Sequence, residues 1–132
     1  MKELGYEELF ESYTQIYELL QNTISVKWER ILFYAVLSSG TYVMKYYVDS
    51  GNNQFVDCYS LENSDRSVIR KAFMSIYRIL QSYRDNLPEE KRWSVITLII
   101  NSDGKFKADY DYADISDSFQ AKINAWERKY LS

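Results

Sequence analysis

The sequence contains no histidine and only one cysteine, Cys58, among its 132 residues. Without histidine the chain lacks the side chain that most often transfers protons near neutral pH. Ser-His-Asp triads, Cys-His pairs and histidine-liganded zinc are therefore excluded. A single cysteine cannot form an internal disulfide bond, and no histidine is present to activate its thiol. We expect Cys58 to be a small core residue.

Long apolar runs and an export signal are also missing. No stretch approaches the roughly 20 apolar residues that span a bilayer. The acidic segment 1–8 is not followed by the apolar core of a signal peptide. We therefore expect a cytoplasmic protein without a membrane partner. The length suits one hydrophobic core, so we expect a single domain over residues 1–132.

Tyrosine, in contrast, is abundant, with 13 residues in the chain. Its rigid apolar ring and polar tip suit half-buried surfaces that contact another protein. The same ring also packs well in a protein core. Both interpretations stay open for each individual tyrosine.

The first half of the chain changes its hydrophobic pattern once. Apolar residues at steps of three and four predict a helix over about residues 3–21. β-branched and aromatic residues, interrupted by two turn clusters, then predict antiparallel strands at about 28–37, 41–48 and 54–59. A meander is the simplest connection of these strands.

A second helix and a buried strand follow. An apolar arc at helical spacing predicts a helix with Asn63 or Ser64 as its N-cap. The helix ends near Asn86, because Pro88 restricts the residue before it. The nearly unbroken apolar run 93–100 predicts a strand that is buried on both faces.

Residues 101–104 have the composition of a tight turn, which predicts a hairpin with a returning strand. In that strand Phe106, Ala108, Tyr110 and Tyr112 alternate with Lys105, Lys107, Asp109 and Asp111. Strict alternation of this kind predicts one buried face and one solvated face.

The chain closes with a helix that includes Phe119, Ile123, Trp126 and Tyr130 at helical spacing. Asp117 and Gln120 form a predicted capping pair at its start. We expect Trp126 to be a core residue. The predicted fold is α+β, with an antiparallel sheet covered by helices in the order α-βββ-α-ββ-α.

The densest polar cluster consists of Asp103, Asp109, Asp111, Asp114 and Asp117. Asp109 and Asp111 project from the same face of a strand and could share a divalent metal. The segment lacks the glycine and glutamate of a calcium-binding loop, however, and has no evident base. We expect no catalysis, no metal and no cofactor, with a carboxylate-dependent metal enzyme as the alternative. A solvated strand face and an acidic contact surface both stay open.

A second alternative comes from the basic residues of the predicted central helix, which are Arg66, Arg70, Lys71, Arg78 and Arg84. Such a helix is a candidate for a nucleic-acid-binding module. These cations divide between two faces of the helix, and the chain has a formal net charge of −3. We therefore expect solvated cations and ion pairs, and no direct binding of nucleic acid.

Several segments of the sequence together resemble one known family. The most specific is Ser-Asp-Gly-Lys-Phe-Lys-Ala-Asp-Tyr-Asp-Tyr at 102–112, which follows the predicted strand that starts at Trp93. The others are Trp-Glu-Arg-Lys-Tyr-Leu at 126–131, the segment 28–35 and the pair Tyr46-Tyr47. They resemble the YezG/EsaG family of immunity proteins, whose members close with Trp-x-x-Lys-Tyr-Leu.

Members of that family bind and neutralise the nuclease domains of polymorphic toxins inside the producing cell. These are typically LXG-type toxins, exported by type VII secretion systems of Gram-positive bacteria. The resemblance implies an antitoxin whose partner is the nuclease domain of a cognate toxin. On this basis the expected partner-binding residues are Asp103, Asp109, Tyr110, Asp111, Tyr112 and Asp114. An acidic surface there can compete for the basic groove in which a nuclease binds phosphate.

Overall fold

The computed structural model describes residues 3–38, 41–112 and 119–131. Its first half contains helix α1 (Glu3–Gln21) and strands β1 (Arg30–Ser38), β2 (Thr41–Asp49) and β3 (Phe55–Asp57). Its second half contains helix α2 (Arg66–Asp85), strands β4 (Val95–Asn101) and β5 (Phe106–Asp111), and helix α3 (Phe119–Leu131). Short 3₁₀ helices occur at Cys58–Ser60 and Glu89–Lys91. This α+β order is the predicted one.

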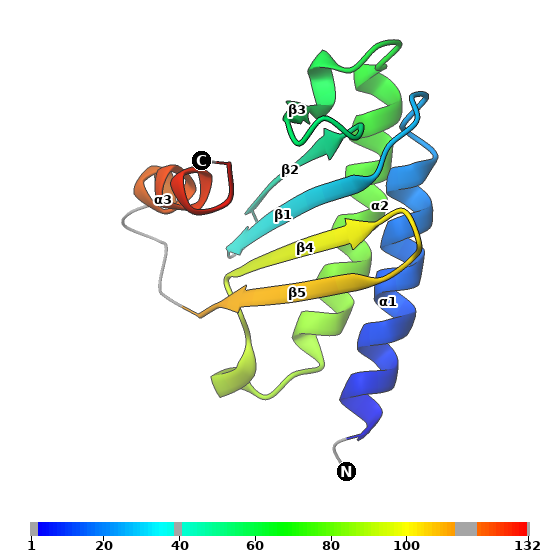
Figure 1. Cartoon of the computed structure of the whole chain (residues 1–132). Helices are drawn as coiled ribbons and strands as arrows, with labels where there is room; N and C mark the ends of the chain where they lie inside the picture. The colour runs from blue at the N-terminus through cyan, green and yellow to red at the C-terminus, as the bar shows by residue number, and fades with distance from the viewer. Residues whose placement is uncertain (1–2, 39–40, 113–118, 132) are drawn as a thin grey trace.

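The strands form one antiparallel sheet in the order β3-β2-β1-β4-β5, as Figure 1 shows. β1, β2 and β3 are joined as a meander, which confirms that prediction. β4 returns through α2 to pair with the free side of β1, so β1 lies at the centre of the sheet. β5 then forms the outermost strand.

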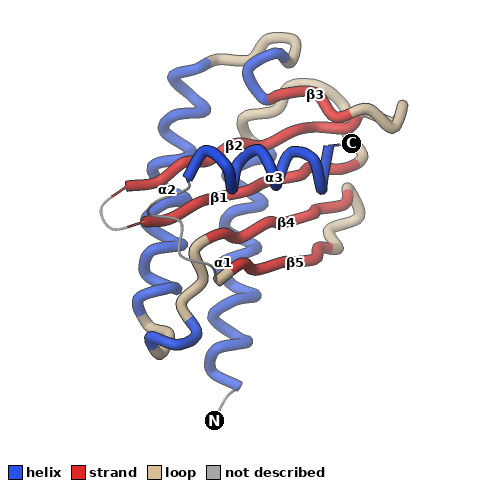
Figure 2. The backbone as a smooth tube through the Cα atoms, turned by 90° about the vertical axis from the view of Figure 1, so that its left-hand side faces the viewer, coloured by secondary structure: helices blue, strands red, loops and turns tan. Residues whose placement is uncertain are grey.

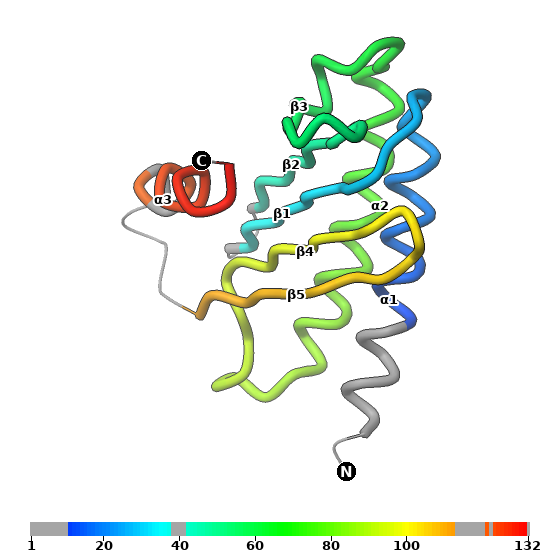
Figure 3. The backbone as a smooth tube through the Cα atoms, in the orientation of Figure 1, coloured from blue at the N-terminus to red at the C-terminus, as the bar shows by residue number. Residues whose placement is uncertain are grey.

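Helices cover both faces of this sheet. α1 and α2 lie side by side on one face, and α3 crosses the opposite face (Figures 1 and 2). α1 and α3 consequently lie on opposite sides of the sheet (Figure 3). None of the helices in the described residues is long and apolar enough to cross a membrane.

The larger core lies between the sheet and the α1–α2 pair. Ile16 and Ile76 from the helices meet Phe33, Tyr46 and Leu98 from the strands, and all five are fully buried. Burial of each such side chain contributes about 1.5–3 kcal/mol to folding. The smaller core under α3 contains Leu32, Tyr34, Val36, Tyr47, Val95 and Trp126. β4 is therefore buried on both faces, as predicted.

The predicted N-cap of α2 is wrong. The cap is Asp65, whose Oδ1 accepts the N–H groups of Ser67 at 2.8 Å and Val68 at 3.3 Å. Asn63 adopts a left-handed conformation with φ of 62°. Ser64 turns its hydroxyl back to donate to the carbonyl of Tyr59 at 3.0 Å. These two residues form the turn before the helix, so the cap falls one residue later than predicted.

β3 is shorter than the predicted strand at 54–59. Asp57 accepts the N–H of Tyr59 at 2.8 Å, and this bond starts a 3₁₀ turn that ends the strand. The turn places Cys58 in the larger core, which confirms the prediction for that residue. Burial raises the pKa of its thiol to about 11, so the thiol is protonated at neutral pH.

Candidate functional site

A tight turn positions β5 against β4, as predicted. The N–H of Asn101 donates to the carbonyl of Lys105 at 2.8 Å, and Gly104 closes the turn with a φ of 90°. Asp103 accepts the N–H of Lys105 at 2.9 Å through Oδ1. Glycine fits here because a side chain is strained at such a positive φ. The turn sets the register that pairs Thr97 with Asp109.

Side chains on β5 alternate between the two faces of the sheet, as predicted. Phe106, Ala108 and Tyr110 pack against the larger core. The hydroxyls of Tyr110 and Tyr13 form a hydrogen bond of 2.6 Å, and burial raises the pKa of Tyr110 well above its ordinary value. Tyr110 is therefore an anchor between β5 and α1.

The opposite face of β5 matches its prediction only in part, since Lys105 and Lys107 are exposed but the two aspartates are not. Asp109 and Asp111 lie on the α3 side and are half-buried rather than fully solvated. α3 covers part of this face, which sequence alternation alone does not reveal. Tyr112, predicted on the buried face, follows the end of β5 and is 57% exposed.

A groove of about 280 Å³ lies between α3 and the adjacent ends of β4 and β5. We name it the α3 groove. It is lined by Val95, Thr97, Asp109, Tyr110, Asp111, Tyr112, Ala125, Trp126, Lys129 and Tyr130. One side thus supplies carboxylates from β5, and the other supplies aromatic rings from α3.

Trp126 fixes α3 on the sheet. Its indole N–H donates to the hydroxyl of Thr97 at 2.8 Å. Its ring lies 4.1 Å from the ring of Tyr34, between centroids, and it is only 8% exposed. The expected core role of Trp126 is confirmed. Because a buried N–H without a partner is costly, this bond also selects the position of the helix.

Tyr130 links α3 directly to the acidic strand. Its hydroxyl donates to Oδ2 of Asp109 at 2.8 Å. Burial and this bond raise the pKa of the Tyr130 hydroxyl to about 12, so it remains a donor at neutral pH. The neighbouring ammonium of Lys129 lies 5.2 Å from the centre of the Tyr130 ring. The groove therefore combines carboxylates, aromatic rings and one ammonium group.

Two sequence segments carry the family resemblance in the second half, 102–112 and 126–131. The end of the first, Asp109–Tyr112, meets Trp126, Lys129 and Tyr130 of the second at this groove. A sequence model described as "Immunity protein YezG-like" matches residues 9–132. This chain belongs to the YezG-like immunity protein family. It is 31% identical over 130 residues to "Immunity protein YezG" of Bacillus subtilis strain 168, covering 90% of this chain and 85% of that protein.

A second relative with the same name comes from Bacillus spizizenii. It is 26% identical over 125 residues, which cover 89% of this chain and 74% of that protein. The match with the YezG-like family thus extends over both halves of the chain. The family membership predicted from the sequence is confirmed.

The six expected partner-binding residues of this YezG-like chain do not form one patch. Asp109, Tyr110, Asp111 and Tyr112 line the α3 groove. Asp103 lies at the other end of β5, in the hairpin turn. Asp114 lies outside the described residues, as does Asp117 of the predicted capping pair.

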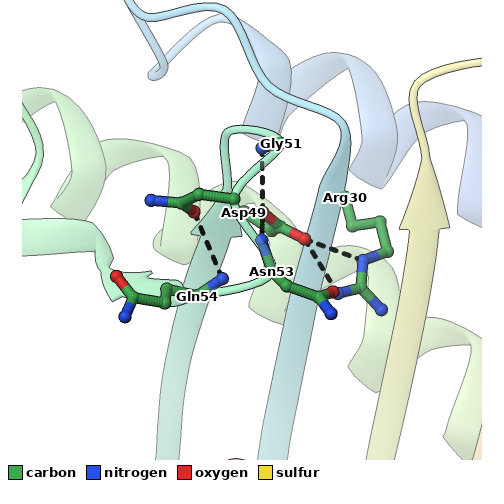
Figure 4. Close-up of polar contacts among 6 residues, drawn as sticks. Arg30, Asp49, Gly51, Asn53 and Gln54 are labelled. Carbon is green, nitrogen blue, oxygen red and sulfur yellow. Dashed lines mark hydrogen bonds and ion pairs between the residues drawn. The ribbon is translucent and has the colours of Figure 1, made fainter.

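Asp103 borders a second groove, of about 570 Å³, which we name the loop groove. Asp49 organises it, as Figure 4 shows: Oδ1 accepts the N–H groups of Gly51 at 2.9 Å and Asn53 at 3.1 Å. Oδ2 forms an ion pair with Arg30 at 2.8 Å. The N–H of Gly51 and the guanidinium of Arg30 lower the pKa of Asp49.

Sequence reasoning predicted a turn here but missed the role of Asp49. The available signal was an aspartate directly before the turn cluster Ser-Gly-Asn-Asn, since such a carboxylate commonly accepts backbone N–H groups two residues later. Asp49 is 3% exposed, and its known bonds account for the loop's conformation. We assign it a structural role.

The structure bears on both alternatives from the sequence, the carboxylate-dependent metal enzyme and the nucleic-acid-binding module. Among the described residues no three acidic or thiol side chains form a group that could hold a metal ion. In α2, Arg84 donates to the carbonyl of Trp93 at 2.6 Å, and Arg66 stacks 4.8 Å from the ring centre of Tyr59. Of the five basic residues of α2, Arg66 and Arg84 thus contact other residues of the same chain.

Proposed function

We propose that this chain is the immunity protein of a polymorphic toxin and neutralises the toxin's nuclease domain by binding it at the α3 groove. The observation that carries the proposal is that residues 109–112 and residues of 126–131, both from segments that resemble the family, line that groove together. The chain acts as a binding protein of one domain and has no catalytic role in this proposal. It works in the cytoplasm of the cell that makes an LXG-type toxin for type VII secretion.

The chemistry of the groove suits a basic side chain of the partner. Asp109 and Asp111 offer carboxylates at one wall, and the rings of Trp126 and Tyr130 form the other. Lysine and arginine place their charged ends on carboxylates while their apolar stems pack on aromatic rings. Arginine is also enriched among the residues that dominate protein interfaces.

A basic partner surface is what a nuclease provides. Nucleases bind the phosphate backbone through lysine and arginine, and an acidic protein surface competes for the same groups. Complementary charge also accelerates association, which matters when a toxin must be captured before it cleaves nucleic acid. Once the α3 groove holds the basic residues of the toxin, nucleic acid can no longer reach them, and the nuclease is inhibited sterically.

The proposal expects a toxin gene beside the gene of this chain, and co-expression of the two tests it. We expect the chain to copurify with the toxin's C-terminal domain and to restore growth of bacteria that express that domain. Failure of both would overturn the assignment. The nuclease part is tested separately, because purified C-terminal domain should degrade DNA or RNA and lose that activity when the chain is added.

Paired variants locate the contact. Asp109→Asn with Asp111→Asn removes two negative charges from the α3 groove, and we expect toxin affinity to fall by about tenfold to a hundredfold. Asp103→Asn is the matched control, since its carboxylate lies at the loop groove. Equal losses in both proteins would show that the α3 groove is not the contact surface.

A further inference from the structure

The two edge strands of the sheet differ in how much unpaired backbone they present. β3 is three residues long and ends in a 3₁₀ turn. β5 is six residues long and lies beyond β4 at the other edge, where no described strand pairs with it. Figures 1 and 2 both show β5 as the outermost strand. β3 pairs only with Tyr47–Asp49, so the rest of β2 also lacks a described strand on its outer side. β5 is the longer of the two edge strands, and it alone of the two borders the α3 groove.

Two hydrogen bonds determine which backbone groups of β5 face outward. Leu37 N–H donates to the carbonyl of Ser94 at 2.9 Å, on the β1 side of β4. Asn101 N–H donates to the carbonyl of Lys105 at 2.8 Å, on the β5 side. Bonded pairs alternate along an antiparallel ladder, so even-numbered residues of β4 bond to β1 and odd-numbered ones to β5.

The register then assigns the residues of β5. Ile99 pairs with Lys107 and Thr97 pairs with Asp109, so Lys107 and Asp109 direct their backbone groups toward β4. Ala108 and Tyr110 direct theirs away from the sheet. Their N–H and carbonyl groups form the outer edge, where no strand among the described residues pairs with them.

We propose that the β5 edge binds an extended segment of the toxin as a sixth strand, through the outward backbone groups of Ala108 and Tyr110. This inference rests on the proposed function, because it takes the toxin as the partner. Addition of a strand to an exposed sheet edge is a common mode of peptide recognition. It extends the contact from the α3 groove along the adjacent strand.

The two faces of β5 specify the chemistry of that segment. Side chains of an added strand would lie about 5 Å from their cross-strand neighbours. On the α3 face these neighbours are Lys107, Asp109 and Asp111, so lysine or arginine is favoured opposite the two aspartates and not opposite Lys107. On the other face Ala108 and Tyr110 border the larger core and favour apolar side chains. The expected segment alternates basic and apolar residues.

β5 lacks several of the usual protections of an edge strand. Proteins block such edges with proline, bulges, very short strands or charged side chains, especially lysine. β5 contains no proline, and its register with β4 runs without interruption from Phe106 to Asp111. It does carry the exposed Lys107, whose side chain lies on the α3 face by the alternation of the strand.

The substitution Ala108→Pro tests the proposal. Proline removes the outward N–H but no ladder bond to β4, so the fold should persist. We expect affinity for the purified C-terminal domain of the adjacent toxin to fall by about tenfold or more. Ala108→Ser is the matched control, because it changes the side chain and keeps the N–H. Unchanged affinity of Ala108→Pro would overturn the proposal.

Hydrogen exchange on the unmodified chain gives a second measurement that does not depend on a variant folding. Toxin binding should slow hydrogen exchange at the amides of Ala108 and Tyr110. If a complex forms and exchange at these amides is unchanged, the strand addition is wrong, but the proposed function stands. If the unmodified chain does not bind the toxin domain at all, the proposed function itself fails. If Ala108→Pro instead converts a dimer of this chain to a monomer without weakening the complex, the edge serves self-association and the proposal is wrong.

Discussion

The two faces of the sheet are covered by helices but differ in chemistry. The face under α1 and α2 is packed with large apolar side chains such as Phe33 and Ile76, both fully buried. The face under α3 combines a smaller apolar cluster with Thr97, Asp109 and Asp111. Apolar burial stabilises a fold, whereas half-buried carboxylates beside aromatic rings suit contact with a partner. We infer that one face stabilises the protein and the other recognises the toxin.

The largest effect should come from the α1–α2 face. Phe33→Ala leaves a cavity at the centre of the sheet and should lower the free energy of unfolding by about 4 kcal/mol. Chemical denaturation measures this loss. Val56→Ala is the control, because Val56 is 37% exposed on the edge strand β3. A loss for Phe33→Ala as small as that of the control would remove the distinction between the faces.

On the α3 face, Trp126→Ala should cost about 3 kcal/mol and abolish toxin binding. It removes the contact with Tyr34 and the hydrogen bond to Thr97. Hydrogen exchange should accelerate mainly in α3, because the larger core does not depend on this residue. Trp126→Phe keeps an aromatic ring without the N–H and should have a smaller effect. Equal acceleration in α1 and α3 would show that the two faces unfold as one unit.

High pH should weaken the larger core through its buried tyrosines. Burial raises the pKa of Tyr46 from 10.0 to about 12, while the unfolded chain retains the ordinary value. The unfolded state therefore loses its proton first, and stability is lost as pH rises from about 10 to 12, by about 2 kcal/mol for this residue. Denaturation curves at stepwise pH measure the loss. Tyr46→Phe should flatten the dependence, and an unchanged slope would exclude Tyr46 as its source.

Tyr130→Phe should have the smallest effect on stability, about 1 kcal/mol, because it removes one half-buried hydrogen bond to Asp109. Denaturation measures this loss, and calorimetry measures toxin affinity. Tyr42→Phe is the matched control, since the ring of Tyr42 stacks on Tyr77 at 4.5 Å. A loss no greater than the control's would mean that the bond to Asp109 does not help to hold α3 on the sheet.

Periodicity in the sequence predicts most of the fold because burial imposes it. The apolar spacing in α1 and α2 and the continuous run of β4 follow from their positions in the larger core and the middle of the sheet. The errors lie at element ends, where single polar contacts decide. Asp65 rather than Ser64 caps α2, and the hydrogen bond that the N–H of Tyr59 donates to Asp57 ends β3 early.

The candidate site was only partly predictable. Alternation along β5 places Asp109 and Asp111 together on one face, but the burial of that face depends on where α3 packs. The position of α3 depends on contacts between residues far apart in sequence, such as Trp126 with Thr97. For the same reason the sequence grouped Asp103 with residues that the structure places around a different groove.

The single cysteine gives this protein a native reporter of its own opening. Cys58 is 0% exposed, so a thiol reagent reaches it only in molecules whose core has transiently unfolded. The labelling rate then measures the population of that open state. A bound toxin reduces this population by the factor 1 + [toxin]/Kd, provided it binds only the folded chain. Slower labelling of Cys58 in the presence of toxin thus yields its affinity without an introduced probe.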